Sequence, residues 1–183
     1  VMILKIRDVI ELCDDKKPRS RKWEKVDRLV VHRIGDSLGN DAISISEKFN
    51  DQSEYAAGSY TGGNVPYHFF IQKSGTVEQA LELGDNAPHA RRFNTRALAV
   101  ACIGDFRVEK PTAAQYQSLS ELCGLFKLLG LSIWGHDELP GGSSSASKQC
   151  PGPLLDLNQL RADADQAAAN WRDHLLSMHG IRK

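Results

Sequence analysis

The feature that most constrains the fold is a continuous apolar run at 97–104, with the sequence ALAVACIG. It has neither the 3.6-residue period of an amphipathic helix nor the alternation of a half-exposed strand, so both of its faces need cover. Such a run is typical of a central strand in a sheet that has helices on both faces. We therefore expect a strand here, in the middle of a covered sheet.

Further strands are expected at three shorter apolar segments. These are 26–32, 66–72 and 131–135. The segment 66–72 leads into turn residues 73–75 and a return strand from Thr76, which predicts a β-hairpin. The other two segments end at His32 and directly before His136, so both imidazoles are expected at strand ends.

Two amphipathic helices are predicted from their capping residues. Thr112 is expected to cap the first helix, with Gln115 reaching back to it, and Gly130 to end it. Its apolar face consists of Tyr116, Leu119, Leu122, Cys123, Phe126 and Leu129. The second helix is expected between its cap, Asp156, and Gly180. Its inward side chains are Leu157, Leu160, Ala164, Ala167, Trp171 and Leu175. Weaker helix candidates are 3–13 and 41–55.

This order of elements predicts an α/β fold, a single domain with a mixed central β-sheet flanked by helices. A chain of 183 residues, 41% of them hydrophobic, can bury one large core but is short for two. We assign 26–183, including the C-terminal helix, to this domain. Residues 1–25 are expected to be an N-terminal extension made of a weak helix and a basic linker. The Gly/Ser run at 141–147 is expected to be a flexible loop.

Charge excludes some classes of partner. Lys plus Arg and Asp plus Glu each total 23, so the formal net charge is zero and no nucleic-acid partner is expected. The densest basic run is Lys16, Lys17, Arg19, Arg21 and Lys22. We expect this run to be a solvated linker, and contact with an anionic wall polymer or nucleic acid is the alternative.

Hydropathy gives no sign of a membrane or export segment. No apolar stretch approaches the roughly 20 residues that span a bilayer. Charged residues interrupt the apolar N-terminus, so no signal peptide is expected. Because the first residue is Val rather than Met, a removed leader stays possible and the compartment stays open. The sequence does not indicate the oligomeric state. Four cysteines are too sparse for a disulfide scaffold.

Two strand-end histidines and a loop cysteine form a candidate metal site. A catalytic zinc ion takes three protein ligands and keeps a fourth position for water, and His32, His136 and Cys150 match that number. Spacing alone does not decide this, because a lone cysteine is more often a small core residue. His68 and His89 likewise have a plain interpretation as hydrogen-bonded core groups, and His174 and His179 as surface residues of the last helix.

The sequences of six segments, and their order along the chain, give stronger support to a metal site. They are LVVHRIG, VPYHFFIQKSGTVEQAL, NAPHARRFNTRALAVACIGDF, PTAAQYQSL, WGHDELP and SKQCPGPLLDLNQL. Across roughly 26–160 the chain resembles the type 2 N-acetylmuramoyl-L-alanine amidases, the family that includes amidase-type phage lysozymes and the peptidoglycan recognition proteins. The resemblance implies an α/β domain with a zinc site at strand ends. It also implies zinc-dependent hydrolysis of the amide bond between N-acetylmuramic acid and L-alanine in peptidoglycan.

The resemblance also assigns roles to individual residues. It implies Zn²⁺ ligands at His32, His136 and Cys150, and catalytic roles for Tyr67 and Lys148. It implies contacts of His89 and Asn94 with a peptidoglycan or muropeptide substrate, although a role for these two in supporting the ligands by hydrogen bonds is the alternative. Asp137 and Glu138 follow a ligand directly and are expected either to orient it or to form a surface turn.

Two other functions stay open beside the hydrolase. One is a recognition module that binds muropeptides without cutting them, and complete ligand and catalytic positions favour the enzyme over it. The other is an amidase that recycles anhydromuropeptides inside the cell. Such enzymes carry a glutamate in the central strand, whereas the stretch from Ala99 to Ile103 has no carboxylate, which argues against that role. The localisation stays open: the expected site of action is the cell wall, for a periplasmic, a secreted or a phage-delivered protein.

Overall fold

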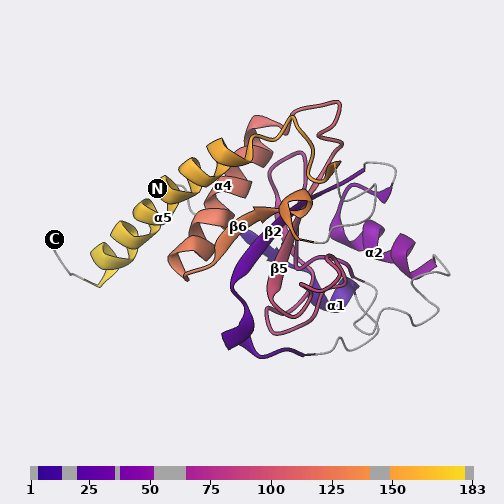
Figure 1. Cartoon of the computed structure of the whole chain (residues 1–183), viewed down its shortest axis with the longest axis horizontal. Coiled ribbons are helices and arrows are strands. Elements are labelled where there is room, and N and C mark those ends of the chain that lie inside the picture. Colours follow the sequence, from indigo (N-terminus) through magenta and orange to yellow (C-terminus); the bar gives the residue numbers. More distant parts are fainter. Residues whose placement is uncertain (1–3, 14–19, 36–37, 52–64, 141–148, 180–183) are drawn as a thin grey trace.

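The computed structural model describes residues 4–13, 20–35, 38–51, 65–140 and 149–179. A sheet lies in the middle, with helices α4 and α5 on one side and α1 and α2 on the other (Figure 1). Across the sheet, the strands are β1 (Ile6–Asp8), β4 (Val77–Gln79), β3 (Phe69–Ile71), β5 (Ala97–Ile103), β2 (Arg28–Ile34) and β6 (Ser132–Gly135). The predicted mixed sheet flanked by helices is confirmed.

Strand β5 occupies the interior position that its apolar sequence predicted. It pairs in parallel with β3 on one side and with β2 on the other, and every one of its side chains is buried. Strands β3 and β4 pair antiparallel around the turn 72–76, so the predicted hairpin is confirmed. The other four neighbouring pairs in the described sheet run parallel.

Helices α4 (Ala113–Leu128) and α5 (Leu157–Met178) cover one face of the sheet. Their predicted caps are confirmed, because the Thr112 hydroxyl accepts from the Gln115 amide and the Asp156 carboxylate accepts from the Gln159 amide. The Gln115 side chain does not reach back to Thr112. Its Nε2 donates instead to the carbonyls of Ile71 and Ile103, both at 2.9 Å, which end β3 and β5 and need a donor once buried.

The apolar faces of these helices are buried where the two helices meet the sheet. The buried members are Leu119, Leu122, Cys123, Phe126, Leu160, Ala164 and Ala167. The helices pack so closely that a Cβ on Gly124 would lie 2.5 Å from that of Ala167. The prediction of inward side chains was wrong for Leu129, 56% exposed, and Leu175, 43% exposed. The last turns of α5 extend beyond α4 (Figure 1), and the predicted terminator Gly180 lies outside the described residues.

On the other face lie α1 (Ile10–Cys13) and α2 (Ala42–Asp51). The helix expected over 3–13 was wrong for 6–8, which form β1 and pair in parallel with β4. The buried carboxylate of Glu78 explains the arrangement, because it pairs with Arg7 at 3.2 Å and accepts from the Ala42 amide at 2.8 Å. One side chain thus joins β1, β4 and the start of α2. Residues 52–55 of the helix expected over 41–55 lie outside the described part.

Arg21 departs from the expected solvated linker. It is half-buried, and its guanidinium donates to the carbonyls of Leu83 and Asn94, both at 2.9 Å, and to that of Ala97. Burial lowers the pKa of Arg21 to about 10, so it stays charged at neutral pH. Lys22 is exposed as expected, and Lys16, Lys17 and Arg19 lie outside the described residues.

The division of the chain at residue 25 stays a prediction. Described residues on its N-terminal side pack on the sheet through β1, α1 and Arg21. No helix among the described residues is both long and apolar enough to cross a membrane.

We predict that Arg21→Met lowers the free energy of unfolding by about 2–4 kcal/mol, because three inward carbonyls lose a charged donor. Arg91→Met is the matched control. Arg91 is exposed, in the loop between β4 and β5 whose carbonyls Arg21 binds, and its replacement should change stability by less than about 0.5 kcal/mol. Urea unfolding of both variants measures the difference. Equal losses in the free energy of unfolding would show that the Arg21 contacts do not stabilise this loop.

Candidate metal centre

Parallel pairing of β2 and β6 brings His32 and His136 together. Val31 is paired with Gly135, so the two histidines that follow lie side by side, with ring centroids 4.5 Å apart. Val31 packs under α4 and α5, and strand alternation therefore turns His32 to the opposite face of the sheet. His32 lies two residues before the end of β2 rather than at its end.

Cys150 completes a group of three possible metal ligands. One ligand atom each from His32, His136 and Cys150 lies within 4.8 Å of the other two, and Nδ1 of His32 is 3.6 Å from Sγ of Cys150. Zinc–nitrogen bonds of about 2.0–2.1 Å and zinc–sulfur bonds of about 2.3 Å at a tetrahedral angle put N and S about 3.6 Å apart. The donor types and this separation fit a zinc ion.

The two imidazoles are in the protonation state that a metal ion needs, whereas the thiol is not. Burial, reinforced by His89 and His136, lowers the pKa of His32 well below its usual value, and burial also lowers the pKa of His136. Both imidazoles are therefore neutral and keep a lone pair. Burial raises the pKa of the Cys150 thiol to about 11, so a metal that binds the thiolate must displace a proton.

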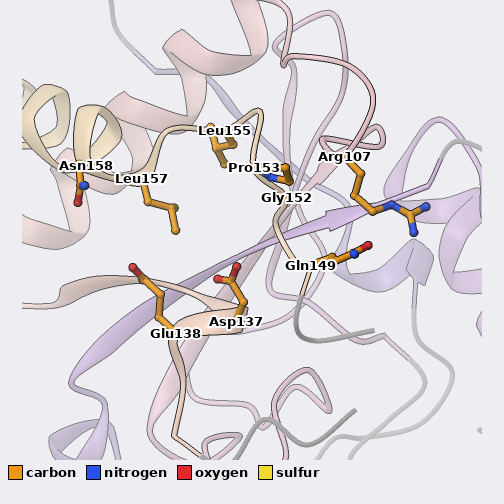
Figure 2. A pocket seen from close by; sticks show the side chains of 9 residues that line it. All are labelled: Arg107, Asp137, Glu138, Gln149, Gly152, Pro153, Leu155, Leu157 and Asn158. Carbon is orange, nitrogen blue, oxygen red and sulfur yellow. The ribbon is translucent and has the colours of Figure 1, made fainter. Parts of the chain in front are cut away.

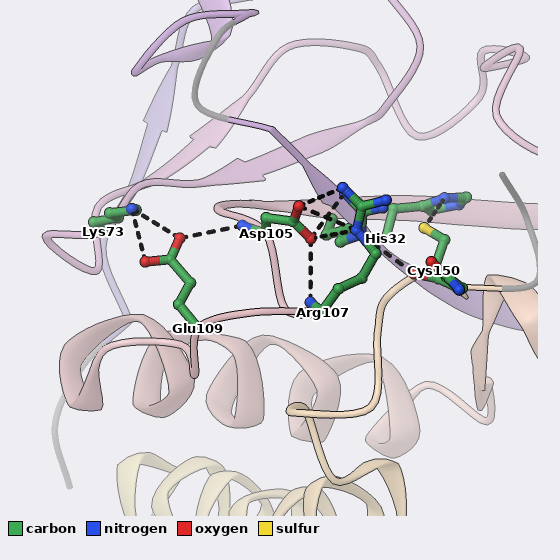
Figure 3. A network of polar contacts seen from close by, with 8 residues as sticks. His32, Lys73, Asp105, Arg107, Glu109 and Cys150 are labelled. Carbon is green, nitrogen blue, oxygen red and sulfur yellow. Dashed lines mark hydrogen bonds and ion pairs between the residues drawn. The ribbon is translucent and has the colours of Figure 1, made fainter.

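Backbone contacts hold the loop that carries Cys150. The Arg33 guanidinium donates to the Gln149 carbonyl at 3.2 Å, and the Asp137 amide donates to the Cys150 carbonyl at 2.8 Å. Arg33 is itself paired with Asp105, 3.3 Å away. Asp105 belongs to a polar network that reaches from Lys73 and Glu109 to the ligand group (Figure 3). The cysteine is thus held through its own carbonyl and through that of the preceding residue, Gln149.

Gly152 is required by the path of the same loop. Its φ is +114°, and a Cβ there would lie 2.6 Å from the backbone carbonyl of Phe106. The Leu154 amide donates to that carbonyl at 3.0 Å, which closes the loop onto the segment after β5. A side chain at residue 152 would push the Cys150 loop away from the histidines.

Helix α5 supports the turn that carries His136. This residue starts the short 3₁₀ helix η3 (His136–Glu138), and the Glu138 carboxylate accepts from the Gly135 amide at 2.7 Å. Arg161 of α5 forms an ion pair with Glu138 and donates to the Ile133 carbonyl at 3.1 Å. Of the two roles expected for Glu138, the structure shows contacts that orient the ligand's turn.

A cavity of about 480 Å³ adjoins the ligand loops. Its walls are Arg107, Asp137, Glu138, Gln149, Gly152, Pro153, Leu155, Leu157 and Asn158. Figure 2 shows the carboxylates of Asp137 and Glu138 pointing toward the side where Leu157 lies, with Arg107 and Gln149 at the other end. Asp137 and Gln149 are direct neighbours of ligand candidates, so the loops that position the ligands also wall this cavity.

The structure brings Tyr67 and His89 to the site. The half-buried Tyr67 ring has its centroid 4.9 Å from that of His32. His89 is buried, with Nδ1 3.0 Å from Nε2 of His32. The Asn94 side chain is used within its own loop, where its oxygen accepts from the Ala90 amide at 2.8 Å. Lys148 lies outside the described residues, as does the 141–147 run.

His68 is a hydrogen-bonded core residue, in line with its plain interpretation. Its Nδ1 accepts from the Ala99 amide at 3.0 Å, and its Nε2 lies 3.0 Å from the Asp85 carbonyl and 2.8 Å from Nη2 of Arg21. His179 is exposed and His174 half-buried on α5. Sequence reasoning missed two contributors, Arg21 and the contact between His89 and His32. A single arginine in a basic run carries no signal of burial, and the pairing of two distant histidines is visible only in three dimensions.

The fold and this side-chain group define a mixed α/β domain with a three-ligand candidate metal centre. The family model described as N-acetylmuramoyl-L-alanine amidase matches residues 22–153. Because this is more than half of the chain, the protein belongs to that family, as its sequence motifs predicted.

Named relatives agree with this placement. A peptidoglycan-recognition protein of Drosophila simulans is 26% identical over 98 residues, which make up 54% of this chain and 53% of that protein. The chain thus spans about half the length of this relative.

Solved structures share the fold. The N-acetylmuramoyl-L-alanine amidase LysC from Clostridium intestinale URNW has a TM-score of 0.65 at 21% identity, covering 88% of this chain and 97% of that one. The Ph2119 endolysin from the Thermus scotoductus MAT2119 bacteriophage has a TM-score of 0.65 at 20% identity, covering 87% and 99%.

We predict that His68 makes the fold sensitive to acid. Burial, helped by the Arg21 charge, lowers the pKa of His68 from 6.5 to about 3. Below pH 6.5 the unfolded chain binds a proton that the folded protein does not, so this contribution to stability falls as pH falls. Between pH 7 and 5 the loss from His68 is about 2 kcal/mol. Urea unfolding of wild type and His68→Gln across this range should give a shallower pH dependence for the variant. Equal slopes would contradict the assignment.

Proposed function

We propose that the protein is a zinc-dependent amidase that hydrolyses the bond between N-acetylmuramic acid and L-alanine in bacterial peptidoglycan. The observation that carries the proposal is the convergence of His32, His136 and Cys150, with Tyr67 beside them, in a chain of the amidase family. Peptidoglycan or its muropeptide fragments are the proposed substrate, and Zn²⁺ is the proposed cofactor.

His32, His136 and Cys150 would hold the ion. Three protein ligands leave a fourth tetrahedral position for water or substrate, as a hydrolytic site requires. When bound there, zinc supplies Lewis-acid polarisation of the scissile carbonyl and lowers the pKa of water toward about 7. Two neutral imidazoles and one thiolate leave the loaded centre with a net positive charge, which favours the negative charge that develops on the substrate oxygen.

Tyr67 and Lys148 are the proposed catalytic side chains. The Tyr67 ring packs near His32, so its hydroxyl can orient the attacking water or donate a hydrogen bond to the substrate oxygen. Lys148 lies two residues before Cys150 in sequence and is proposed to stabilise the tetrahedral intermediate as a fixed positive charge. His89 and Asn94 were expected to contact substrate, and their observed contacts favour supporting roles instead.

The same residues bear on the two alternatives to the hydrolase. A binding module without activity needs no complete ligand set, so the presence of all three ligand types favours the hydrolase. The recycling alternative relied on a carboxylate in the central strand, and β5 has only apolar side chains. Intact cell walls are therefore the first substrate to test.

The direct test is mass spectrometry of muropeptides after incubation of the zinc-supplemented protein with purified walls. We expect free stem peptides with L-alanine at their amino termini. If the protein sediments with walls but releases no such peptides, the recognition module is correct and the hydrolase is not. Release from soluble anhydromuropeptides alone would indicate recycling.

Variants in the same assay test the residue roles. Cys150→Ser should lose zinc and turnover, whereas Cys123→Ala, which removes a thiol from the core under α4, should keep both. Unchanged zinc stoichiometry in Cys150→Ser would overturn the ligand assignment.

Lys148→Ala should keep zinc but lose a factor of about 10²–10³ in rate. Lys110→Ala, which replaces an exposed lysine, is its control.

A further inference from the structure

Both ring nitrogens of His32 have a neighbour, and only one of these neighbours is a ligand candidate. Nδ1 lies 3.6 Å from Sγ of Cys150, and Nε2 lies 3.0 Å from Nδ1 of His89. The His32 and His89 rings meet edge to face, with an interplanar angle of 88°. His32 is 1% exposed and His89 8%, so water has little access to the contact between them.

A hydrogen bond between these two rings can run in only two directions when both are neutral. If His32 donates from Nε2, its Nδ1 carries a lone pair directed toward the Cys150 side. If His89 donates from Nδ1, the His32 proton must sit on Nδ1, where it blocks a metal ion. The direction of one hydrogen bond therefore decides whether His32 can be a ligand.

We propose that His89 is a positioning residue of the metal centre, which accepts the Nε2 proton of His32 and so presents the Nδ1 lone pair of His32 to the ion. This inference rests on the proposed zinc site but not on amidase activity. Outer groups that fix the tautomer and orientation of a ligating histidine are typically carboxylates, carbonyls or water. Here a second buried imidazole occupies that place.

The loop that carries His89 is held so that Nδ1 faces His32. The His89 amide donates to the Ala87 carbonyl at 2.9 Å, and Asn94 closes the following turn by accepting from the Ala90 amide at 2.8 Å. Arg21 binds the carbonyls of Leu83 and Asn94, near the two ends of this loop. Support for the ligand therefore begins at Arg21, one residue before the part of the chain that the family model matches.

The other ring nitrogen of His89 does not compete for this contact. Nε2 makes no hydrogen bond of ordinary geometry within the described residues. The 3.0 Å contact from Nδ1 to Nε2 of His32 is therefore the hydrogen bond that the structure gives to the His89 ring.

The main competing role is direct contact with substrate, as the sequence first suggested. The His89 side chain is only 8% exposed and its Nδ1 already faces His32, so it has little surface and no free Nδ1 with which to contact a substrate. A purely structural role in packing is the other alternative. These roles differ in their effect on zinc affinity, because only the positioning role requires a hydrogen-bond acceptor at residue 89.

The test is the zinc dissociation constant, measured by competition with a chromophoric chelator. His89→Ala should raise it about 10–100-fold. His89→Asn, whose side-chain oxygen can accept where Nδ1 did, should recover most of the affinity. His179→Asn is the control, because it alters an exposed histidine that follows α5 and should leave zinc affinity unchanged.

Nitrogen NMR of the zinc-loaded wild type gives a second readout that needs no variant to fold. The proposal expects His32 to be bound through Nδ1 with a slowly exchanging proton on Nε2. It is overturned if His32 binds through Nε2, or if folded His89→Ala binds zinc as tightly as wild type. If wild type binds no zinc, the proposed metal centre fails as well. If wild type binds zinc with these properties but cuts no wall, only the proposed amidase function fails.

Discussion

The parallel pairing of β2 with β5 and β6 is the constraint on which the rest of the site depends. Parallel strands end at the same edge of a sheet, so residues that follow paired positions lie side by side. The pairing of Val31 with Gly135 alone brings two histidines from distant parts of the sequence to a ring separation of 4.5 Å. Strand β5, buried on both faces, holds β2 in place and leaves no polar side chain of its own in the centre.

Around this pair, each proposed ligand is fixed by a separate part of the chain. Cys150 is held by Arg33 through the neighbouring Gln149 carbonyl, and the turn at His136 is held by Glu138 and by Arg161 of α5. His32 is held by His89, whose loop is fastened by Arg21. Charged side chains that bind backbone carbonyls recur in this scheme, because buried loop carbonyls need donors and an arginine supplies several at once.

Much of the fold could be predicted from the sequence, because its signals are local. The apolar run of β5, the hairpin and the caps Thr112 and Asp156 each depend on a few neighbouring residues. The convergence of the three candidate ligands could also be predicted, from motifs in a known order. Strand β1 could not, since three exposed residues become a strand only by pairing with β4. The hydrogen bonds of Gln115 and Arg21 could not be predicted for the same reason, because their partners are carbonyls that come close only in the folded chain.

The central claim is that His32, His136 and Cys150 together hold a single zinc ion with one position left open. X-ray absorption spectroscopy at the zinc edge of the metal-loaded protein tests it most directly. The account predicts two nitrogen neighbours at about 2.0–2.1 Å, one sulfur at about 2.3 Å and one further light atom from water. A spectrum without sulfur, or one with two or more sulfur neighbours, would contradict it.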